Sequence, residues 1–264
     1  MATPRLASPW GKVALILSII ACAGLTAAHA LSGRVPLPLL VAAFLLLLGV
    51  LVAGVLFQGS GVFARPLQSV ATARAEVAIT IDDGPDPVST NALLDVLDAR
   101  GQRATFFVIG ERAERHPELL RAIAARGHAV ENHSMHHSWA TTFTGSARLA
   151  AELERASELV RAATGRKPRW FRAPVGLLSP RVASAAAIAG LQLVGWSATA
   201  RDGVDFTGPK RSLARLAEGL VPGAVLVIHD ARPGGPALLA QLVDLLDAQK
   251  LRSVTLDELV RGGE

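Results

Sequence analysis

The sequence predicts an α/β protein whose parallel sheet forms a (β/α) barrel, preceded by a hairpin of two transmembrane helices. From residue 76 onward, β-rich runs alternate with segments of helical periodicity, giving about seven β/α units in roughly 190 residues. Before that point, two long apolar stretches contain no charged residue. We therefore expect residues 1–75 to form a membrane segment with a juxtamembrane linker, and residues 76–264 to form one globular domain.

The apolar stretches explain the hydrophobic composition of the chain. Half of its 264 residues are hydrophobic, and the mean hydropathy is +0.36, which is high for a soluble protein. Leu, Val, Ile and Ala predominate at residues 13–33 and 36–57. Each stretch can cross a bilayer as a helix of about 20 residues, and only a short connection around Arg34 joins them. A two-pass helical hairpin is the simplest interpretation.

The first stretch also has features of a secretory signal. Arg5 and Lys12 would form its basic region, and Ala28-His29-Ala30 resembles a cleavage site between small residues. Cleavage would leave the second stretch as a single anchor. In the two-pass interpretation, four Lys/Arg residues flank the hairpin and one, Arg34, lies in its loop. This distribution favours a cytoplasmic side for both ends and for the globular domain, at a bacterial-type inner membrane.

Positive charge is concentrated next to the membrane segment. Residues 1–76 contain five Lys/Arg and one acidic residue, Glu76, so they carry +4 of the formal net charge of +5. The basic isoelectric point, near 10.3, therefore suits an anionic lipid surface. A nucleic-acid partner is not expected, because it would require a basic stripe on the folded domain. The single cysteine, Cys22, lies inside the first apolar stretch, so no disulfide framework is possible.

The elements of the globular domain follow from periodicity and from glycines that stop helices. Residues 77–81 form a β-rich run, and residues 91–100 have leucines at helical spacing before Gly101. Further strands are expected at residues 105–109, 129–132, 170–171, 191–196, 224–228 and 253–255. Further helices are expected at residues 117–126, 146–164, 180–189 and 237–248.

Two polar clusters carry the chemistry. Asp82 and Asp83 follow the first strand, and His133-Ser134-Met135-His136-His137 follows the third. A helical turn would bring His133 and His137, at i and i+4, to one point. One carboxylate and two imidazoles make the three-ligand set of a hydrolytic metal site that keeps a position open for water. The second carboxylate is then available to move a proton.

Other unusual polar residues fall at the same ends of the expected strands. Arg172 follows the fourth strand, Asp202 follows the fifth, and His229 ends the sixth. Since the carboxyl ends of the strands form the catalytic face of a (β/α) barrel, we expect one shared site. Each residue alone has an ordinary interpretation: Asp-Asp-Gly-Pro is a common turn, and His229 could be a core histidine. Those interpretations leave the ordered set unexplained.

Residues 77–258 resemble the polysaccharide deacetylases, the NodB-homology group of carbohydrate esterase family four. The matching segments are Thr80-Ile81-Asp82-Asp83-Gly84, His133-Ser134-Met135-His136-His137, Arg172-Ala173-Pro174-Val175-Gly176, Asp202, and Val227-Ile228-His229. The resemblance implies a distorted (β/α) barrel and the hydrolytic, metal-dependent removal of an N- or O-acyl group from a sugar.

The resemblance assigns a role to each member of the first clusters. Asp83, His133 and His137 would bind a divalent ion, with zinc expected, which polarises the acyl carbonyl and acidifies a water. Asp82 would not bind the ion and would take the proton of the water as general base. Arg172 would pair with Asp82 and orient it.

The remaining site residues follow from the same resemblance. His229 would protonate the departing amine, and Asp202 would favour the imidazolium form of His229. Asp205 is a weaker substitute for Asp202. The backbone N–H of Val175, next to Pro174, would help to stabilise the oxyanion.

Three positions depart from the pattern of the family. Members usually carry Tyr where Val175 stands, Trp where Gly203 stands, and Leu where Val227 stands. The first change is tolerable, because the expected role belongs to the backbone amide. The second removes a wall of the acyl pocket, for which Trp196 or Trp139 is the candidate replacement.

The aromatic composition of the chain limits the classes of substrate to be expected. Enzymes that grip long glycans usually present Tyr and Trp to sugar faces, but this chain has no Tyr and four Trp. With the hairpin and its basic flank, this favours an N-acylated amino sugar on a polyprenyl phosphate carrier, with residues 137–145 facing lipid. The alternatives are a deacetylase of an envelope polysaccharide, peptidoglycan or chitooligosaccharide, and a non-catalytic sugar-binding membrane protein. The oligomeric state stays open.

Overall fold

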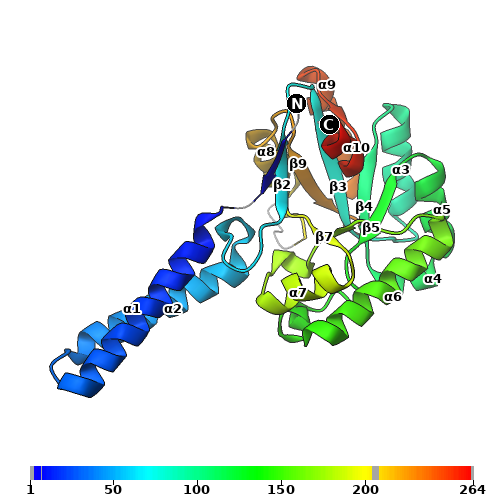
Figure 1. Cartoon of the computed structure of the whole chain (residues 1–264). Helices are drawn as coiled ribbons and strands as arrows, with labels where there is room; N and C mark the ends of the chain where they lie inside the picture. Colours follow the sequence, from blue (N-terminus) through cyan, green and yellow to red (C-terminus); the bar gives the residue numbers. More distant parts are fainter. Residues whose placement is uncertain (1–2, 7, 204–207, 263–264) are drawn as a thin grey trace.

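A computed structural model describes residues 3–6, 8–203 and 208–262 of the chain. Two packed helices, α1 (Trp10–Ser32) and α2 (Leu37–Leu56), project from a curled α/β body (Figure 1). Both helices are long and apolar enough to cross a membrane. The structure therefore confirms the predicted helical hairpin and makes these two helices candidate spans.

The tight connection between α1 and α2 has a local cause. Gly33 adopts a left-handed conformation with φ of 63°, and its N–H donates to the carbonyl oxygen of His29 at 2.8 Å, which ends α1. Pro36 has an extended conformation directly before α2, and Pro38 lies in the first turn, where a missing N–H costs nothing. The chain therefore reverses within a few residues.

Both ends of the hairpin return to the α/β body. Strand β1 (Thr3–Leu6) pairs antiparallel with β2 (Leu67–Ala71), a strand that the sequence analysis placed in the linker. Val62, Leu67 and Val70 are buried. The linker therefore packs on the α/β body, while the domain boundary expected at residue 76 stays a prediction.

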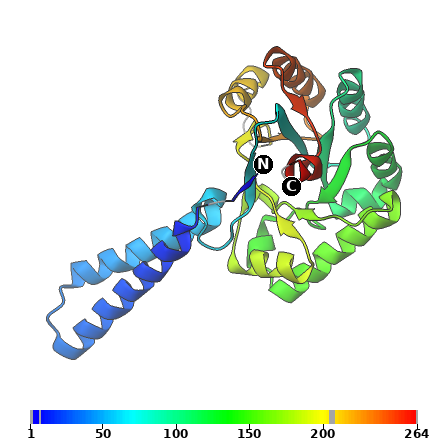
Figure 2. The same ribbon diagram turned by 45° about the horizontal axis from the view of Figure 1, so that its top comes forward.

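A parallel sheet forms the body, with strand order β7-β6-β5-β4-β3-β9-β8 and with β10 also paired to β3. Its strands are β3 (Glu76–Gly84), β4 (Ala104–Val108), β5 (Ala129–Asn132), β6 (Trp170–Phe171), β7 (Gln192–Leu193), β8 (Ala198–Thr199), β9 (Val225–His229) and β10 (Arg252–Ser253). Figure 2 shows helices arranged around the outside of this curled sheet. The predicted distorted (β/α) barrel is confirmed.

The helices of the body include all five that the periodicity predicts. These five are α3 (Thr90–Ala99), α5 (Pro117–Ala125), α6 (Ser146–Thr164), α7 (Pro180–Ile188) and α9 (Gly235–Ala248). The sequence analysis missed α4 (Gly110–Arg115), α8 (Pro209–Glu218) and α10 (Leu256–Arg261), as well as the 3-10 turns η1 (Gln58–Ser60), η2 (Trp139–Phe143) and η3 (Pro174–Gly176). For α10 a signal was present, since Thr255 and Glu258 form a capping box.

The prediction of one continuous strand at residues 191–196 is wrong. Residues 192–193 form β7 at one edge of the sheet, and residues 198–199 form β8 at the other edge. The chain between them crosses the open side of the barrel, where β2 also lies: Leu67 bridges to Val194, and Ser69 bridges to Ala224. Sequence periodicity shows the apolar run but not the change of edge.

The central strand positions the acid pair. Every residue of β3 is buried, as is typical of a parallel strand covered on both faces. Ile79 and Ile81 pack in the main hydrophobic core with residues of β4 and β9, including Phe106 and Ile228. Asp82 and Asp83 follow directly and are therefore held at the end of a rigid, fully packed strand.

Candidate active site

The predicted site residues gather at the carboxyl ends of the strands. Asp82 and Asp83 end β3, His133 follows β5, Arg172 follows β6, Asp202 follows β8 and His229 ends β9. A cavity of about 600 Å³ opens there. Its lining consists of Leu56, Phe57, Gln58, Gly59, Asp82, Asp83, His133, His137, Ala173, Val175, Gly176, Trp196, Thr199, Arg201, Gly203, Val227, His229 and Arg232.

Asp83, His133 and His137 converge on one point. The Nε2 atoms of His133 and His137 lie 3.4 and 3.2 Å from Asp83 Oδ1. The predicted helical turn is wrong, because residues 133–138 form a loop in which Ser134 and His137 have φ of 67° and 49°. Local side-chain contacts replace the helical hydrogen bonds: Asn132 Oδ1 accepts from the Ser134 N–H, and Ser134 Oγ accepts from the His137 N–H.

These three side chains fit a divalent metal ion. Their donor atoms lie within 4.8 Å of one another, and Asp83 Oδ1 is buried without a hydrogen-bond partner among the described residues. His133 Nδ1 lies 2.8 Å from the carbonyl oxygen of Arg172 and can donate to it, which leaves Nε2 for the ion. A carboxylate with two imidazoles is a donor set typical of zinc.

Protonation also favours metal binding. Burial opposes ionisation of Asp83, but the nearby imidazoles of His133 and His137 outweigh it and hold the pKa of Asp83 far below its usual range. Burial, together with the nearby His133, lowers the pKa of His137. At neutral pH these residues are therefore available as a carboxylate and a neutral imidazole, the forms that bind metal.

Asp82 is held by a buried arginine. Arg172 Nη1 donates to Asp82 Oδ1 at 2.6 Å and contacts Thr80 Oγ1 at 2.7 Å, and Nη2 donates to the carbonyl oxygen of Gly195 at 2.8 Å. Its guanidinium lies 4.2 Å from the ring centroid of Phe107. Arg172 is fully buried and Asp82 is 3% exposed. Arg172 thus lies behind Asp82 and restricts the orientation of this carboxylate.

His229 is paired with Asp202. His229 Nδ1 lies 2.7 Å from Asp202 Oδ1, and the backbone N–H of His229 donates to Asp202 Oδ2 at 3.0 Å. Burial lowers the pKa of His229, but the Asp202 hydrogen bond and the charge of Asp82 outweigh this effect and raise it. Gly203 lies against the ring, since a Cβ there would be 2.9 Å from His229 Nε2.

The structure distinguishes among the residues expected at the acyl pocket. Val175 lines the cavity and has a φ of 58°. Trp196 lines it as well, whereas Trp139 is 69% exposed and is not part of the lining. Pro174, grouped with Val175 in the prediction, is buried and does not line the cavity, because it begins the turn η3 that presents Val175.

Backbone contacts fix the acid pair, and the sequence analysis missed them. Asp83 has a left-handed φ of 70°, which is unfavourable for a residue with a side chain. Arg112 Nη1 donates to the Asp83 carbonyl oxygen at 2.7 Å, and the Asp230 N–H donates to the Asp82 carbonyl oxygen at 2.8 Å. Asp230 is itself buried and accepts from Ser89. No periodic pattern marks such long-range contacts.

Cavity residues from two other regions were also missed. Arg201 and Arg232 line the cavity, one residue before Asp202 and three after His229. Residues 56–59, at the end of α2, line it too. The proximity of both arginines to predicted site residues was a usable signal. The position of α2 depends on tertiary packing, and the sequence contains no signal that would predict it.

Two other histidines, His136 and His128, lie away from the donor set. His136 is exposed, and its Nδ1 lies 2.6 Å from Glu111 Oε1. His128 is buried, its Nδ1 accepts from the Ala104 N–H, and burial lowers its pKa to about 4. Asp205, the weaker substitute for Asp202, lies outside the described residues.

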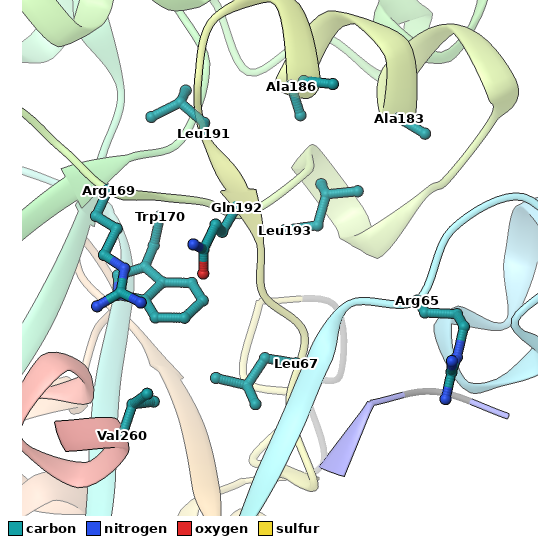
Figure 3. Close-up of a pocket in the computed structure, with 11 residues that line it drawn as sticks. Arg65, Leu67, Arg169, Trp170, Ala183, Ala186, Leu191, Gln192, Leu193 and Val260 are labelled. Carbon is teal, nitrogen blue, oxygen red and sulfur yellow. The ribbon is translucent and has the colours of Figure 1, made fainter. Parts of the chain in front are cut away.

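A second cavity, of about 430 Å³, is separate from these residues. Figure 3 shows Trp170 and Arg169 on one side of it, Arg65 on the other, and alanines of α7 above. Its lining consists of Arg65, Leu67, Arg169, Trp170, Ala183, Ala186, Ala187, Leu191, Gln192, Leu193 and Val260. None of the predicted catalytic or metal-binding residues belongs to it, whereas Asp82, Asp83, His133, His137 and His229 line the cavity at the strand ends.

Comparison with known sequences matches the polysaccharide deacetylase family over residues 69–194. The chain is 39% identical over 160 residues to a chitooligosaccharide deacetylase of Bradyrhizobium sp. (strain ANU 289), which covers 60% of this chain and 72% of the relative. It is 33% identical over 190 residues to a peptidoglycan-N-acetylglucosamine deacetylase of Bacillus cereus, covering 70% of this chain and 88% of the relative.

Solved structures share the same fold. A family 4 carbohydrate esterase from Streptomyces lividans, in complex with acetate, is 31% identical, has a TM-score of 0.63 and covers 67% of this chain and 91% of its own. A family 4 pseudoenzyme from Bacillus anthracis is 22% identical, with a TM-score of 0.68, covering 74% of this chain and 68% of its own. The second likeness concerns the fold alone.

Proposed function

This chain belongs to the polysaccharide deacetylase family, and we propose that it removes an N-acetyl group from an amino sugar with the help of a divalent metal, expected to be zinc. It is a carbohydrate deacetylase, a hydrolase of carbon–nitrogen bonds other than peptide bonds. The observation that carries the proposal is the single cavity that joins Asp83, His133 and His137 with Asp82 and His229.

Asp83, His133 and His137 are the residues that would hold the ion. Once bound, a divalent ion at this position polarises the acyl carbonyl and makes a water more acidic. Asp82 lies beside the donor set without belonging to it. Its Oδ1 is engaged by Arg172, so we assign to its other oxygen the removal of a proton from the attacking water.

His229 supplies the second proton transfer. Its Nδ1 is hydrogen-bonded to Asp202, and this contact orients the ring so that the other nitrogen, Nε2, faces Gly203 in the cavity wall. After water attacks the carbonyl carbon, His229 donates a proton to the amide nitrogen, the carbon–nitrogen bond breaks, and acetate and the free amine result. The backbone N–H of Val175, with its left-handed φ, is assigned to the oxyanion of the tetrahedral intermediate.

The proposed substrate is an N-acetylated amino sugar on a polyprenyl phosphate carrier. The cavity borders the end of α2, a candidate membrane span, so the reacting amide would lie close to the bilayer surface. Residues Trp139 and Phe143 of η2 are exposed and apolar and suit contact with lipid. The chain is proposed to cross the membrane twice, with the body on the cytoplasmic side.

A second candidate is the deacetylation of chitooligosaccharide, peptidoglycan or another envelope polysaccharide. It is favoured by the substrates in the names of the two relatives compared above. A non-catalytic sugar-binding role is disfavoured, because binding alone does not require a base, a metal-ligand set and an acid in one cavity.

Acetate release tests the proposed reaction. Full-length protein in lipid nanodiscs is incubated with N-acetylglucosamine on a short polyprenyl phosphate and, separately, with chitotetraose, and free acetate is measured with and without a chelator. Chelator-sensitive release supports a metal-dependent deacetylase, and the preferred substrate separates the two candidates. Stoichiometric sugar binding without any release would support the non-catalytic role. A reporter fused after Glu264 tests the orientation.

A further inference from the structure

The end of α2 is part of the wall of the catalytic cavity. Leu56 is the last residue of the helix, and residues 56–59 line the same cavity as Asp82 and His229. Gln58 Nε2 donates to the carbonyl oxygen of Trp196 at 3.4 Å, and the N–H of Leu178 donates to the carbonyl oxygen of Val55 at 3.1 Å. The candidate span is thus attached to two loops that surround the cavity.

The attachment is close. A Cβ at Gly195 would lie 1.9 Å from Gln58 Oε1, so a larger residue at this position would displace the Gln58 amide from where it lies now. Phe57 remains 64% exposed although it lines the cavity. This exposed aromatic ring, at the junction of a candidate membrane helix and the cavity, offers an apolar surface to a ligand.

Two cationic side chains line the same cavity. Within residues 3–6, 8–203 and 208–262, no side-chain hydrogen bond or ion pair holds the exposed guanidinium of Arg201. Arg232 is 37% exposed, and its Nη2 lies 3.7 Å from Asp83 Oδ2. The proton transfers proposed above use neither arginine. Guanidinium groups are well suited to binding phosphate oxygens in pairs.

From this combination we propose that residues 56–59, Arg201 and Arg232 form a subsite for the lipid phosphate part of the substrate. Leu56 and Phe57 contact the first carbons of the lipid chain, and the arginines bind the phosphate that joins it to the sugar. The membrane helix then selects the substrate as well as anchoring the enzyme. This inference rests on the proposed deacetylase function and adds the residues that choose its substrate.

Two variants and two matched controls test the subsite. Phe57→Ala and Arg201→Ala each remove one expected contact without touching the metal donors. Phe44→Ala changes an exposed aromatic residue in the middle of α2, and Arg211→Ala changes an exposed arginine of α8. Each full-length protein in nanodiscs of neutral lipid is assayed with N-acetylglucosamine on farnesyl phosphate and with chitotetraose.

For Phe57→Ala and Arg201→Ala, kcat/KM for the farnesyl substrate should fall about tenfold or more, mainly through KM, as expected for losing a charge-assisted hydrogen bond or a buried apolar contact. The loss should be several-fold smaller for chitotetraose, which carries no lipid phosphate, and both control variants should change less than about twofold on either substrate. Equal losses on both substrates, or no loss on either, would overturn the subsite.

A binding measurement separates the failure of the subsite from the failure of the proposed reaction. Farnesyl phosphate is titrated into each protein, and its dissociation constant is measured without any turnover. The subsite predicts binding about tenfold or more weaker in Phe57→Ala and Arg201→Ala than in wild type. Unchanged affinity refutes the subsite even if acetate is released. If both variants bind farnesyl phosphate more weakly than wild type, but wild type itself releases no acetate, the subsite is supported and the proposed deacetylase reaction is refuted.

Discussion

Replacing Arg172 by methionine should cost both stability and activity. Met fills much of the same space beside Phe107 and Trp196, whose ring centroids lie 4.2 and 5.8 Å from the guanidinium carbon. It cannot make the hydrogen bonds to Asp82, Thr80 and Gly195. The carboxylate of Asp82, only 3% exposed, then remains buried without its cationic partner.

Removing one partner of a buried ion pair typically costs about 3–5 kcal/mol. For a domain of this size, each kcal/mol lowers Tm by roughly 2–4 °C, so a fall of roughly 6–20 °C is expected. The general base also loses its orientation. Because general base catalysis contributes about 10²–10⁴ in rate, kcat should fall by about 10² or more.

Tm is measured by tryptophan fluorescence in detergent, and kcat by acetate release. The double variant Arg172→Met/Asp82→Asn provides the control, since it leaves no unpaired buried charge. It should be about 1 kcal/mol or more stable than Arg172→Met alone, while remaining inactive. Two results would contradict the role of the Arg172–Asp82 pair. One is a Tm of Arg172→Met within about 2 °C of wild type, and the other is a Tm of the double variant below that of Arg172→Met.

Three further predictions concern protons and metal. Asp202→Asn removes the contact that raises the pKa of His229; since His229 acts in its protonated form, the alkaline limb of the kcat profile should move to lower pH, and an unmoved limb would exclude Asp202 from this role. Glu131, buried beneath the N–H groups of Arg169 and Trp170, has its pKa raised by burial to about 8 from an ordinary 4.5, so stability should decline as pH rises between these values. Glu131→Gln keeps an oxygen that can accept from both N–H groups and should flatten the decline of Tm across this window; a decline as steep as that of wild type would contradict the assignment. Removal of metal with a chelator should abolish acetate release and lower Tm, and zinc should restore both; the Tm of Asp83→Asn should not respond to zinc, and a response would place the ion elsewhere.

Residue spacing was sufficient to predict most strands of the parallel sheet and the end of the sheet at which the predicted site residues meet. Several β-rich runs are followed by an ionisable residue, and in a parallel sheet those ends meet, so Asp82, His133, Arg172, Asp202 and His229 could be assigned to one face from the sequence. The apolar stretches likewise predicted the hairpin, because a bilayer-length helix needs only composition and length.

The loop that carries the two histidines could not be predicted from spacing. Residues at i and i+4 meet on a helix, but Asn132 and Ser134 bond to nearby backbone N–H groups and replace the helical turn. Asn132 is held in turn by Ser157 and the Leu153 carbonyl of α6, which comes later in the chain. The side chains still converge, through left-handed backbone rather than helical geometry.

Long-range packing explains the other omissions. The segment 191–196 is mostly apolar, but only residues 192–193 pair with β6, and the chain then crosses to the other edge of the sheet, where residues 198–199 pair with β9. Long-range contacts also position β2, which fills the open side of the barrel, and residues 56–59, which reach the cavity only because α2 packs against loops far along the chain. A single sequence contains no periodic signal for such contacts.

The division of labour between two adjacent acids is the central claim, and one paired measurement tests it. Metal content and acetate release are determined on the same preparations of wild type, Asp82→Asn and Asp83→Asn. We predict that Asp82→Asn keeps one metal per chain while its kcat falls by about 10²–10⁴, and that Asp83→Asn loses the metal. Near-normal turnover by Asp82→Asn, or full metal occupancy in Asp83→Asn, would contradict the assignment.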